Sequence, residues 1–216
     1  MRIKSCSENR HYPSLMLLLI TLIFAAVLPS CGYLIQPTIK QNIVHLEKGS
    51  YTADPQHTTV LFKINHMGLS TFVGRFNKVD ASLEFDPDKI ESARLTAVID
   101  VASVDVNNQE LEENLRDSSW LHTEKYPQAL FKTTGVELID EKSAKFSGIF
   151  TLHGVTKPMV LNVTFNGGGN NMLTGAYTLG FSATTSFNRS VFGVDYLIPA
   201  IGDKVDIEVF AEFQKQ

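Results

Sequence analysis

The chain has 216 residues, of which 19 are basic and 23 are acidic, so its formal net charge at pH 7 is −4. This mildly acidic balance argues against partners that are bound through their negative charge, such as nucleic acid or an anionic lipid surface. Hydrophobic residues make up 44% of the chain, which is enough for a folded domain with a core of its own.

The first thirty residues predict a targeting segment. A basic start precedes the apolar run Leu15–Leu28, which is shorter than the roughly 20 residues that a membrane-spanning helix needs. The run ends in LPSCG, which resembles the lipobox of bacterial lipoproteins, in which the cysteine is lipidated after cleavage. We therefore expect residues 1–30 to be a lipoprotein signal peptide and Cys31 to carry the lipid. An uncleaved anchor and ordinary secretory cleavage nearby are the alternatives.

Removal of residues 1–30 leaves 16 basic and 22 acidic residues, a formal charge of −6, and Cys31 as the one cysteine. An intramolecular disulfide is then excluded, so the core alone must stabilise the fold. Stable membrane attachment needs two or more acyl chains, which lipoproteins as a class carry. Gly32 after the cysteine favours outer-membrane sorting, facing the periplasm. Residues 31–48 show no clear period and are expected to form a tether.

From Gly49 onward the hydrophobic pattern alternates with a period of two, which predicts β-strands. The stretch TTVLFKINHMGLSTFVGRF (Thr58–Phe76) alternates, turns at Met67–Gly68 and alternates again. Further turns are predicted at His153–Gly154 and, most strongly, at NGGGNN (Asn166–Asn171). Other alternating runs begin near Val79, Ala93, Phe146, Met159, Tyr177 and Val205.

One segment departs from the strand pattern. Residues 107–127 begin with an asparagine and early acidic residues, and Leu111 and Leu115 are four apart, so we expect one or two short helices that cross between strands.

About eight alternating strands predict an antiparallel sheet with one buried face, and a sheet of that size closes or splits into two layers. Gly74, Gly148 and Gly180 interrupt strand patterns and suit the bends or bulges that closure needs. We therefore expect an all-β fold: a closed antiparallel barrel of about eight strands with a short helical crossing, in one domain over residues 49–216.

Phenylalanines dominate the face that is predicted to be buried. They suit a barrel whose core they simply fill. The same face also carries His66, Thr185 and Ala183, which would leave gaps and a few hydrogen-bonding groups, as in ligand pockets. An eight-stranded barrel is just wide enough to be filled by side chains or to hold one small ligand. Strands of about ten residues, roughly 33 Å long, would make that interior long and narrow.

Several motifs resemble a known family. The segments KYPQALFKTTGVELI, FSGIFTLHGVTKPMVLNVTF and GFSATTSFNRSVFGV, within a match from about Tyr51 to Phe213, are similar to the YceI family of bacterial polyisoprenoid-binding proteins. The resemblance implies a lipocalin-like barrel whose elongated apolar pocket holds a polyisoprenoid chain, often that of a quinone, without a family-wide catalytic activity. The family usually has R-D-x-H-L ahead of the YP motif. Here Asn114 stands near the place of that histidine while Leu115 matches, so the head-group preference is expected to differ if that histidine contacts the ligand.

These observations predict a binding site and its residues. His66 is either a polar residue of the barrel wall or a contact for the polar end of the ligand, and Trp120 either plugs one end of the barrel or belongs to its entrance. The residues expected to contact a ligand are Phe62, Ile64, His66, Phe72, Phe76, Leu115, Trp120, Phe150, Phe181 and Phe187.

An enzyme is the least expected function. The histidines show no metal-binding spacing, and the chain has no G-x-S-x-G nucleophile motif, so we expect neither catalytic residues nor a metal site. We expect a protein of the bacterial envelope that sequesters or carries an isoprenoid lipid or isoprenoid quinone and needs no cofactor. The alternative is an envelope stress or adhesion module that uses the barrel as a scaffold. The sequence leaves a homodimer open.

Overall fold

The computed structural model describes residues 36–216, of which residues 38–216 form one compact unit. The predicted signal peptide and Cys31 lie outside the described residues. Within them, no helix is both long enough and apolar enough to cross a membrane. The strands and the helix are β1 (Gly49–His66), β2 (Ser70–Phe76), β3 (Val79–Phe85), β4 (Arg94–Asp100), β5 (Val104–Asp105), α3 (Gln109–Arg116), β6 (Gln128–Leu138), β7 (Ser143–Leu152), β8 (Val155–Asn170), β9 (Tyr177–Asn188) and β10 (Ile201–Lys215). Short 3₁₀ turns are η1 (Ile43–His45), η2 (Ile90–Ser92), η3 (Val101–Ser103) and η4 (Arg189–Phe192).

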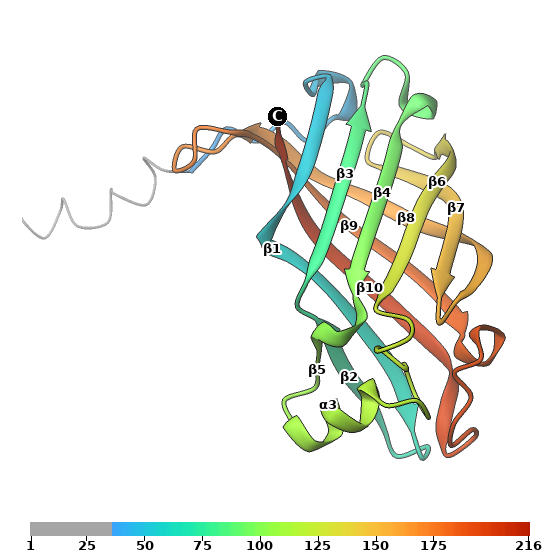
Figure 1. Ribbon diagram of the computed structural model, residues 1–216. Coiled ribbons are helices and arrows are strands. Elements are labelled where there is room, and N and C mark those ends of the chain that lie inside the picture. Colours follow the sequence, from blue (N-terminus) through green and yellow to red (C-terminus); the bar gives the residue numbers. More distant parts are fainter. Residues whose placement is uncertain (1–35) are drawn as a thin grey trace, which may run out of the picture. The chain divides into compact units, whose positions relative to one another are not determined.

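Eight of these strands close a barrel. The ring runs β1, β3, β4, β6, β7, β8, β9 and β10, and the pairing of β10 with β1 closes it, each neighbouring pair being antiparallel. In Figure 1, β3 and β4 cross the front of this barrel, and β9 and β10 cross behind them. The expected all-β, closed antiparallel barrel of about eight strands is therefore confirmed, and α3 is its one α-helix among the described residues.

The two remaining strands, β2 and β5, extend the wall at one end of the barrel. β3 pairs with the first part of β1, whereas β2 pairs with its last part, from Val60 to His66, and β5 then pairs with β2. The turn between β1 and β2 has positive φ angles at Met67 and Gly68, as the predicted tight turn requires. Figure 1 places this hairpin at the same end of the barrel as α3.

The helical crossing contains one helix. The side chain of Asn108 accepts a hydrogen bond from the backbone N–H of Leu111 and so caps α3. Residues 117–127 continue as turns rather than as a second helix.

The prediction of a hairpin turn at NGGGNN was wrong. Gly167, Gly168 and Gly169 belong to β8, and the turn to β9 comes later, after Asn170. The glycines are explained by a close approach instead, because Lys40 exchanges two backbone hydrogen bonds with Gly168. A Cβ atom at Gly169 would lie 2.6 Å from the carbonyl oxygen of Thr38.

The segment ahead of β1 packs against the barrel, although all of residues 31–48 were expected to form a tether. Ile43 and Leu46 are buried in the core cluster at the end of the barrel where β8 ends. Their spacing of three, in and just after the short η1 turn, is too brief a pattern to show up as an element in the sequence.

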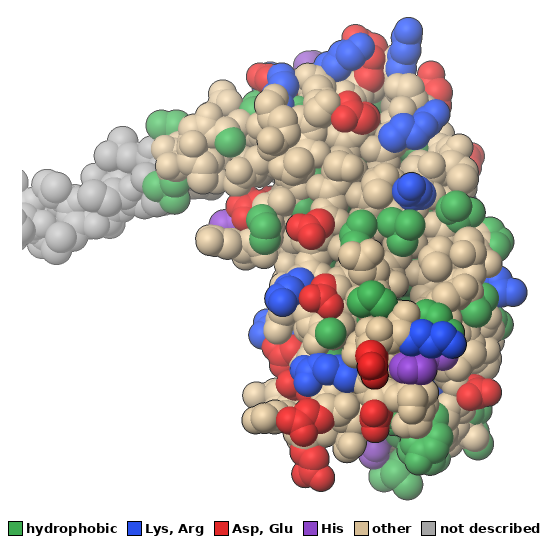
Figure 2. Space-filling view, in the orientation of Figure 1, with side chains coloured by type: hydrophobic (Ala, Val, Ile, Leu, Met, Phe, Trp, Pro, Cys, Tyr) green, Lys and Arg blue, Asp and Glu red, His purple; other side chains and the backbone are tan. Residues whose placement is uncertain are grey.

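The outer surface of the barrel carries charges of both signs. On the face drawn in Figure 2, acidic and basic side chains are interspersed, without a large area of one sign. The ion pairs between described residues join side chains that are partly or fully exposed, such as Lys204 with Asp206 at 2.7 Å. Such pairs contribute little to stability, so the fold depends mainly on its apolar interior.

Two of the three strand glycines make room for aromatic rings of the neighbouring strand. A Cβ atom at Gly74 would meet the ring of Phe62, and one at Gly148 would lie 2.5 Å from the ring of Phe131. The third, Gly180, pairs with Gly167 at a register shift in the β8–β9 ladder. Barrel closure was expected to need bends at these glycines, but bending explains them only in part, because two of them also leave room for aromatic rings.

The exchange Gly148→Ala is expected to lower the free energy of unfolding by about 2 kcal/mol, the usual cost of overpacking. The new methyl group would lie 2.5 Å from the carbonyl oxygen of Lys132 as well as from the ring of Phe131, and backbone cannot move away as a side-chain tip can. Urea unfolding measures the change. Gly135→Ala is the control, because a Cβ atom there meets nothing within 4 Å, and it should leave stability equal or higher. Equal effects of the two exchanges would contradict this account.

Candidate functional site

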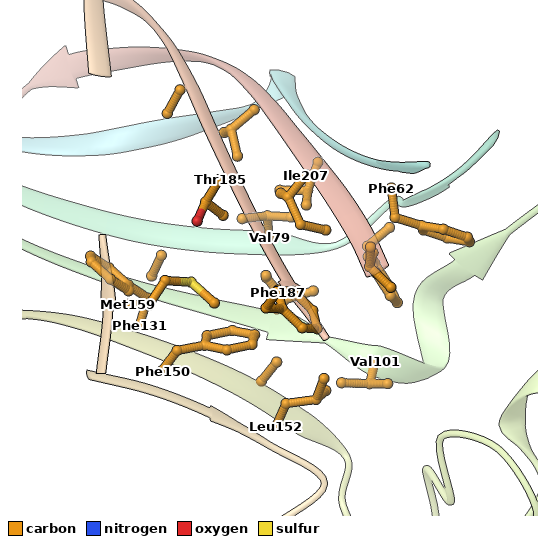
Figure 3. A pocket seen from close by; sticks show the side chains of 18 of the residues that line it. Phe62, Val79, Val101, Phe131, Phe150, Leu152, Met159, Thr185, Phe187 and Ile207 are labelled. Carbon is orange, nitrogen blue, oxygen red and sulfur yellow. The ribbon is translucent and has the colours of Figure 1, made fainter. Parts of the chain in front are cut away.

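The barrel encloses a cavity of about 460 Å³. All eight strands of the ring contribute inward-facing side chains to its wall, together with α3 and the segments that precede β6 and β10. The lining side chains are apolar or aromatic except Thr58, His66, Thr185 and Arg189. Figure 3 shows side chains from several strands, among them Phe62, Val79 and Phe150, directed into this space. The interior is therefore a long, mostly apolar surface with few polar groups, which suits an apolar ligand.

The two ends of the cavity differ. At one end, called the closed end below, large side chains such as Tyr51, Leu83 and Phe165 are at most 3% exposed and fill the barrel. At the other end, called the α3 end, the lining includes Leu115 and Trp120, both half-buried, and Leu197, which is 49% exposed. The cavity therefore meets solvent at the α3 end.

All ten side chains predicted to contact a ligand line this cavity. They come from β1 and β2, from α3 and the segment after it, and from β7 and β9. The geometry brings them together, while their contact with a ligand stays a prediction. The ten are Phe62, Ile64, His66, Phe72, Phe76, Leu115, Trp120, Phe150, Phe181 and Phe187.

Some of these phenylalanines also serve as ordinary core. The rings of Phe150, Phe187 and Phe192 contact one another with centroids 5.2 to 5.7 Å apart. Toward the closed end, the ring of Phe181 packs edge-on against Phe165 and Phe213. The rings therefore fill the core in some places and leave a cavity between their clusters in others, while the use of that cavity as a ligand pocket stays a prediction.

Apart from Arg189, the polar side chains on the wall form no side-chain hydrogen bonds within residues 36–216. The ring of His66 lies 6.5 Å from that of Phe72 and forms no hydrogen bond within residues 36–216. The hydroxyl of Thr58 is buried without a partner in the same part of the chain. The side chain of Thr185 extends from β9 into the space that Met159 also faces (Figure 3).

Arg189 shapes the α3 end. It is 4% exposed, and its guanidinium donates hydrogen bonds of 2.8 to 3.0 Å to four carbonyl oxygens, those of Val194, Tyr196, Ile201 and Gly202. Burial lowers the pKa of this guanidinium from its usual value, while nearby aspartates act in the opposite direction. The arginine therefore holds the loop ahead of β10 in place.

Trp120 rests on this arrangement. Its ring lies 5.4 Å from the guanidinium carbon of Arg189 and meets Tyr196 edge-on at 5.3 Å. Since Trp120 also lines the cavity, it belongs to the wall at the α3 end.

Sequence reasoning missed several lining residues. Thr58 shares the alternation of Val60 and could have been found by following β1 back by one more step. Met159 likewise lies on the inward face of β8. Leu197 lies in an irregular loop, where no periodicity marks a buried or lining position.

A clamp between β2 and β5 supports the same end of the barrel. One carboxylate oxygen of Asp105 accepts hydrogen bonds from Arg75, at 2.8 and 3.0 Å, and from the side chain of Asn77, at 3.0 Å. The other oxygen accepts one from the backbone N–H of Asn107. The hydrogen bonds from Asn77, Asn107 and Arg75 lower the pKa of Asp105 to about 2.

The clamp predicts a pH-dependent stability. Because the folded state holds the pKa of Asp105 below its usual 3.8, the carboxylate stabilises the fold above that pH, and this contribution is lost as the pH falls toward 2. Asp105→Asn should therefore be less stable than the unchanged protein at pH 7, with a gap that closes between about pH 4 and pH 2. Urea unfolding across this range tests the expectation. The control is Asp80→Asn, at an exposed position without a side-chain hydrogen bond among the described residues, which should be as stable as the unchanged protein throughout. If Asp105→Asn were still less stable than the unchanged protein at pH 2, the expectation would be contradicted.

One group of side chains on the outer surface has the composition of a metal site. Single ligand atoms of Asp54, His57 and Glu212 lie within 4.8 Å of one another. The carboxylate of Asp54 is already engaged, at 2.8 Å each, by Nδ1 of His57 and by the side chain of Gln214. Hydrogen bonding between them raises the pKa of His57 and lowers that of Asp54. The geometry is that of an ordinary surface pair, and the expectation of no metal site stays a prediction.

Comparisons with known proteins agree with this fold. The model of the YceI-like domain matches residues 51–213. A UPF0312 protein of Pseudomonas savastanoi pv. phaseolicola is 39% identical over 139 residues, which cover 64% of this chain and 72% of that protein. The crystal structure of Burkholderia cenocepacia BcnA matches with a TM-score of 0.68 at 23% identity, covering 74% of this chain and 98% of that one. A polyisoprenoid binding domain from Saccharophagus degradans matches with a TM-score of 0.58 at 13% identity, covering 79% and 100%. At these identities the two structures establish a shared fold.

Proposed function

The chain belongs to the YceI-like domain family, and on that premise we propose that it binds a long apolar lipid of the polyisoprenoid class inside its barrel. The observation that carries the proposal is the cavity itself, about 460 Å³ in volume and walled by apolar side chains on all eight strands of the ring. A structural neighbour from Saccharophagus degradans is described as a polyisoprenoid binding domain, which supports the same class of ligand. An isoprenoid quinone is the more specific candidate.

The shape of the wall favours a chain over a compact ligand. Thr58 and His66 line the same cavity from one strand and stand eight residues apart, roughly 26 Å at about 3.3 Å per residue. At about 25 cal/mol per Å², the burial of ~400 Å² of chain contributes on the order of 10 kcal/mol before ordering costs. Strong polar contacts are therefore not needed for binding, and the nearly apolar wall is sufficient.

We propose a binding protein rather than an enzyme. The polar groups on the wall, such as Thr58 and Thr185, are single hydroxyls surrounded by apolar side chains rather than a cluster of titratable groups. The alternative of an envelope module that uses the barrel only as a scaffold would need no cavity, so the open interior favours the carrier. We also propose that the protein is anchored in the envelope through lipidated Cys31, facing the periplasm.

Trp120 provides the experiment. It is the one tryptophan of the chain and lies on the cavity wall, so a ligand that fills the cavity should shift its fluorescence. Titration of delipidated protein with geranylgeraniol, a prenyl alcohol, should give a saturable change at one ligand per protein. Trp120→Phe, which removes the signal, identifies its source. The absence of saturable binding up to the solubility limit of the alcohol would overturn the proposal.

A further inference from the structure

The barrel wall is open along part of the seam between β8 and β9. The ladder between these strands ends at the pair Asn162–Thr184, although β8 begins at Val155 and β9 continues to Asn188. Along this stretch β8 pairs with β7 alone and β9 with β10 alone. Pro158, which has no N–H to donate, lies in the part of β8 that pairs with β7 alone, where the edge toward β9 tolerates a proline.

A second pocket, of about 570 Å³, lies at this seam. Met159, Thr185 and Phe187 line both this pocket and the main cavity. Figure 3 shows these three side chains from within the cavity. The two spaces are therefore neighbours, separated by side chains instead of by a hydrogen-bonded ladder, and the hydroxyl of Thr185 stands at their junction.

The seam pocket differs in chemistry from the main cavity. Its lining includes the side chains of Ser147, Asn162 and Ser186 and one charged residue, Lys157. None of these four side chains forms a hydrogen bond or ion pair within residues 36–216, and no acidic residue lines the pocket. A cation with neighbouring hydroxyl and amide donors, free of carboxylates, suits a ligand group with anionic oxygens.

We propose that the seam pocket holds the phosphate of a prenyl phosphate whose chain lies in the main cavity. This inference rests on the proposed function, since it assumes that the chain of the lipid occupies the barrel. Arg189, the one lysine or arginine among the described residues that line the main cavity, already donates to four carbonyl oxygens and therefore has little left to offer a phosphate. Lys157 has no such competing partner among the described residues, and Met159 and Phe187, which line the seam pocket together with it, also line the apolar cavity.

The experiment compares two ligands that share one chain, geranylgeranyl phosphate and geranylgeraniol, by titration of Trp120 fluorescence in the full-length protein. The unchanged protein should bind the phosphate about tenfold more tightly, the effect of one charge-assisted hydrogen bond. Lys157→Met keeps the apolar stem and should remove this preference while leaving the affinity for the alcohol unchanged. Lys89→Met, at an exposed position between β3 and β4, is the matched control and should keep the preference.

The outcomes separate the two proposals. If the alcohol does not bind, the proposed function itself fails. If the alcohol binds but the phosphate binds no better, or if Lys157→Met leaves the preference intact, only the seam site is contradicted. A preference that disappears in His66→Leu and survives in Lys157→Met would place the head group at the α3 end and overturn the seam site.

Discussion

The exchange Ala183→Trp is expected to abolish lipid binding while the barrel stays folded. Ala183 lies on β9, on the cavity wall between Phe181 and Thr185, and its small side chain leaves the space beside it open. An indole there would occupy the space that the ligand chain needs. The affinity for geranylgeraniol should fall about 100-fold or more, which corresponds to about 2.7 kcal/mol or more of lost binding energy.

The matched control is Thr184→Trp, because the neighbouring side chain is exposed on the outer face of the same strand. It adds an indole of the same size without entering the cavity, so binding should change less than about threefold. Since both variants carry a second tryptophan, binding is measured by isothermal titration calorimetry and folding by circular dichroism. Unchanged binding by a folded Ala183→Trp protein would show that the ligand does not occupy the barrel.

The second large effect is expected from Arg189→Met. The exchange keeps most of the apolar stem but leaves four carbonyl oxygens without the guanidinium that now donates to them. At about 1 kcal/mol for each lost hydrogen bond, the free energy of unfolding should fall by about 4 kcal/mol. The loop ahead of β10 should become accessible to protease at the same time, because the arginine is what ties it to the barrel.

The control is Arg94→Met. Arg94 is exposed and donates to only two carbonyl oxygens, those of Glu91 and Ala93. Water can replace a donor at the surface, so the exchange should cost less than about 1 kcal/mol. Similar losses for the two arginines in urea unfolding would contradict the role assigned to Arg189.

The wall of the site could be predicted from the sequence because strand alternation places every second residue on one face. Once Val60 and Phe62 are assigned to the inside, Ile64 and His66 follow, and the structure places all four on the cavity wall. The same reasoning places Phe181 and Phe187 there from β9. Closure of the barrel followed from the number of strands, since a sheet of that size has few other ways to bury one face.

Other parts depend on which strands become neighbours, and alternation within one strand does not carry that information. The glycines in NGGGNN have the composition of a turn, yet they are in β8, where they pair with β9 on one side. On the other side Gly168 pairs with Lys40, over a hundred residues earlier. The open seam between β8 and β9 arises because the two strands diverge beyond Asn162 and Thr184. Pro158 is the one residue in the sequence that could have indicated an unpaired edge there.

The central claim is that the barrel carries an isoprenoid chain, and native mass spectrometry of gently purified full-length protein tests it most directly. The account predicts a protein whose mass exceeds that of the denatured chain by the mass of one lipid, and organic extraction should release a molecule with an isoprenoid fragmentation pattern. Ala183→Trp, purified in parallel, should lack the added mass. Repeated recovery of lipid-free protein from its own host, or of a bound lipid that Ala183→Trp retains, would contradict the claim.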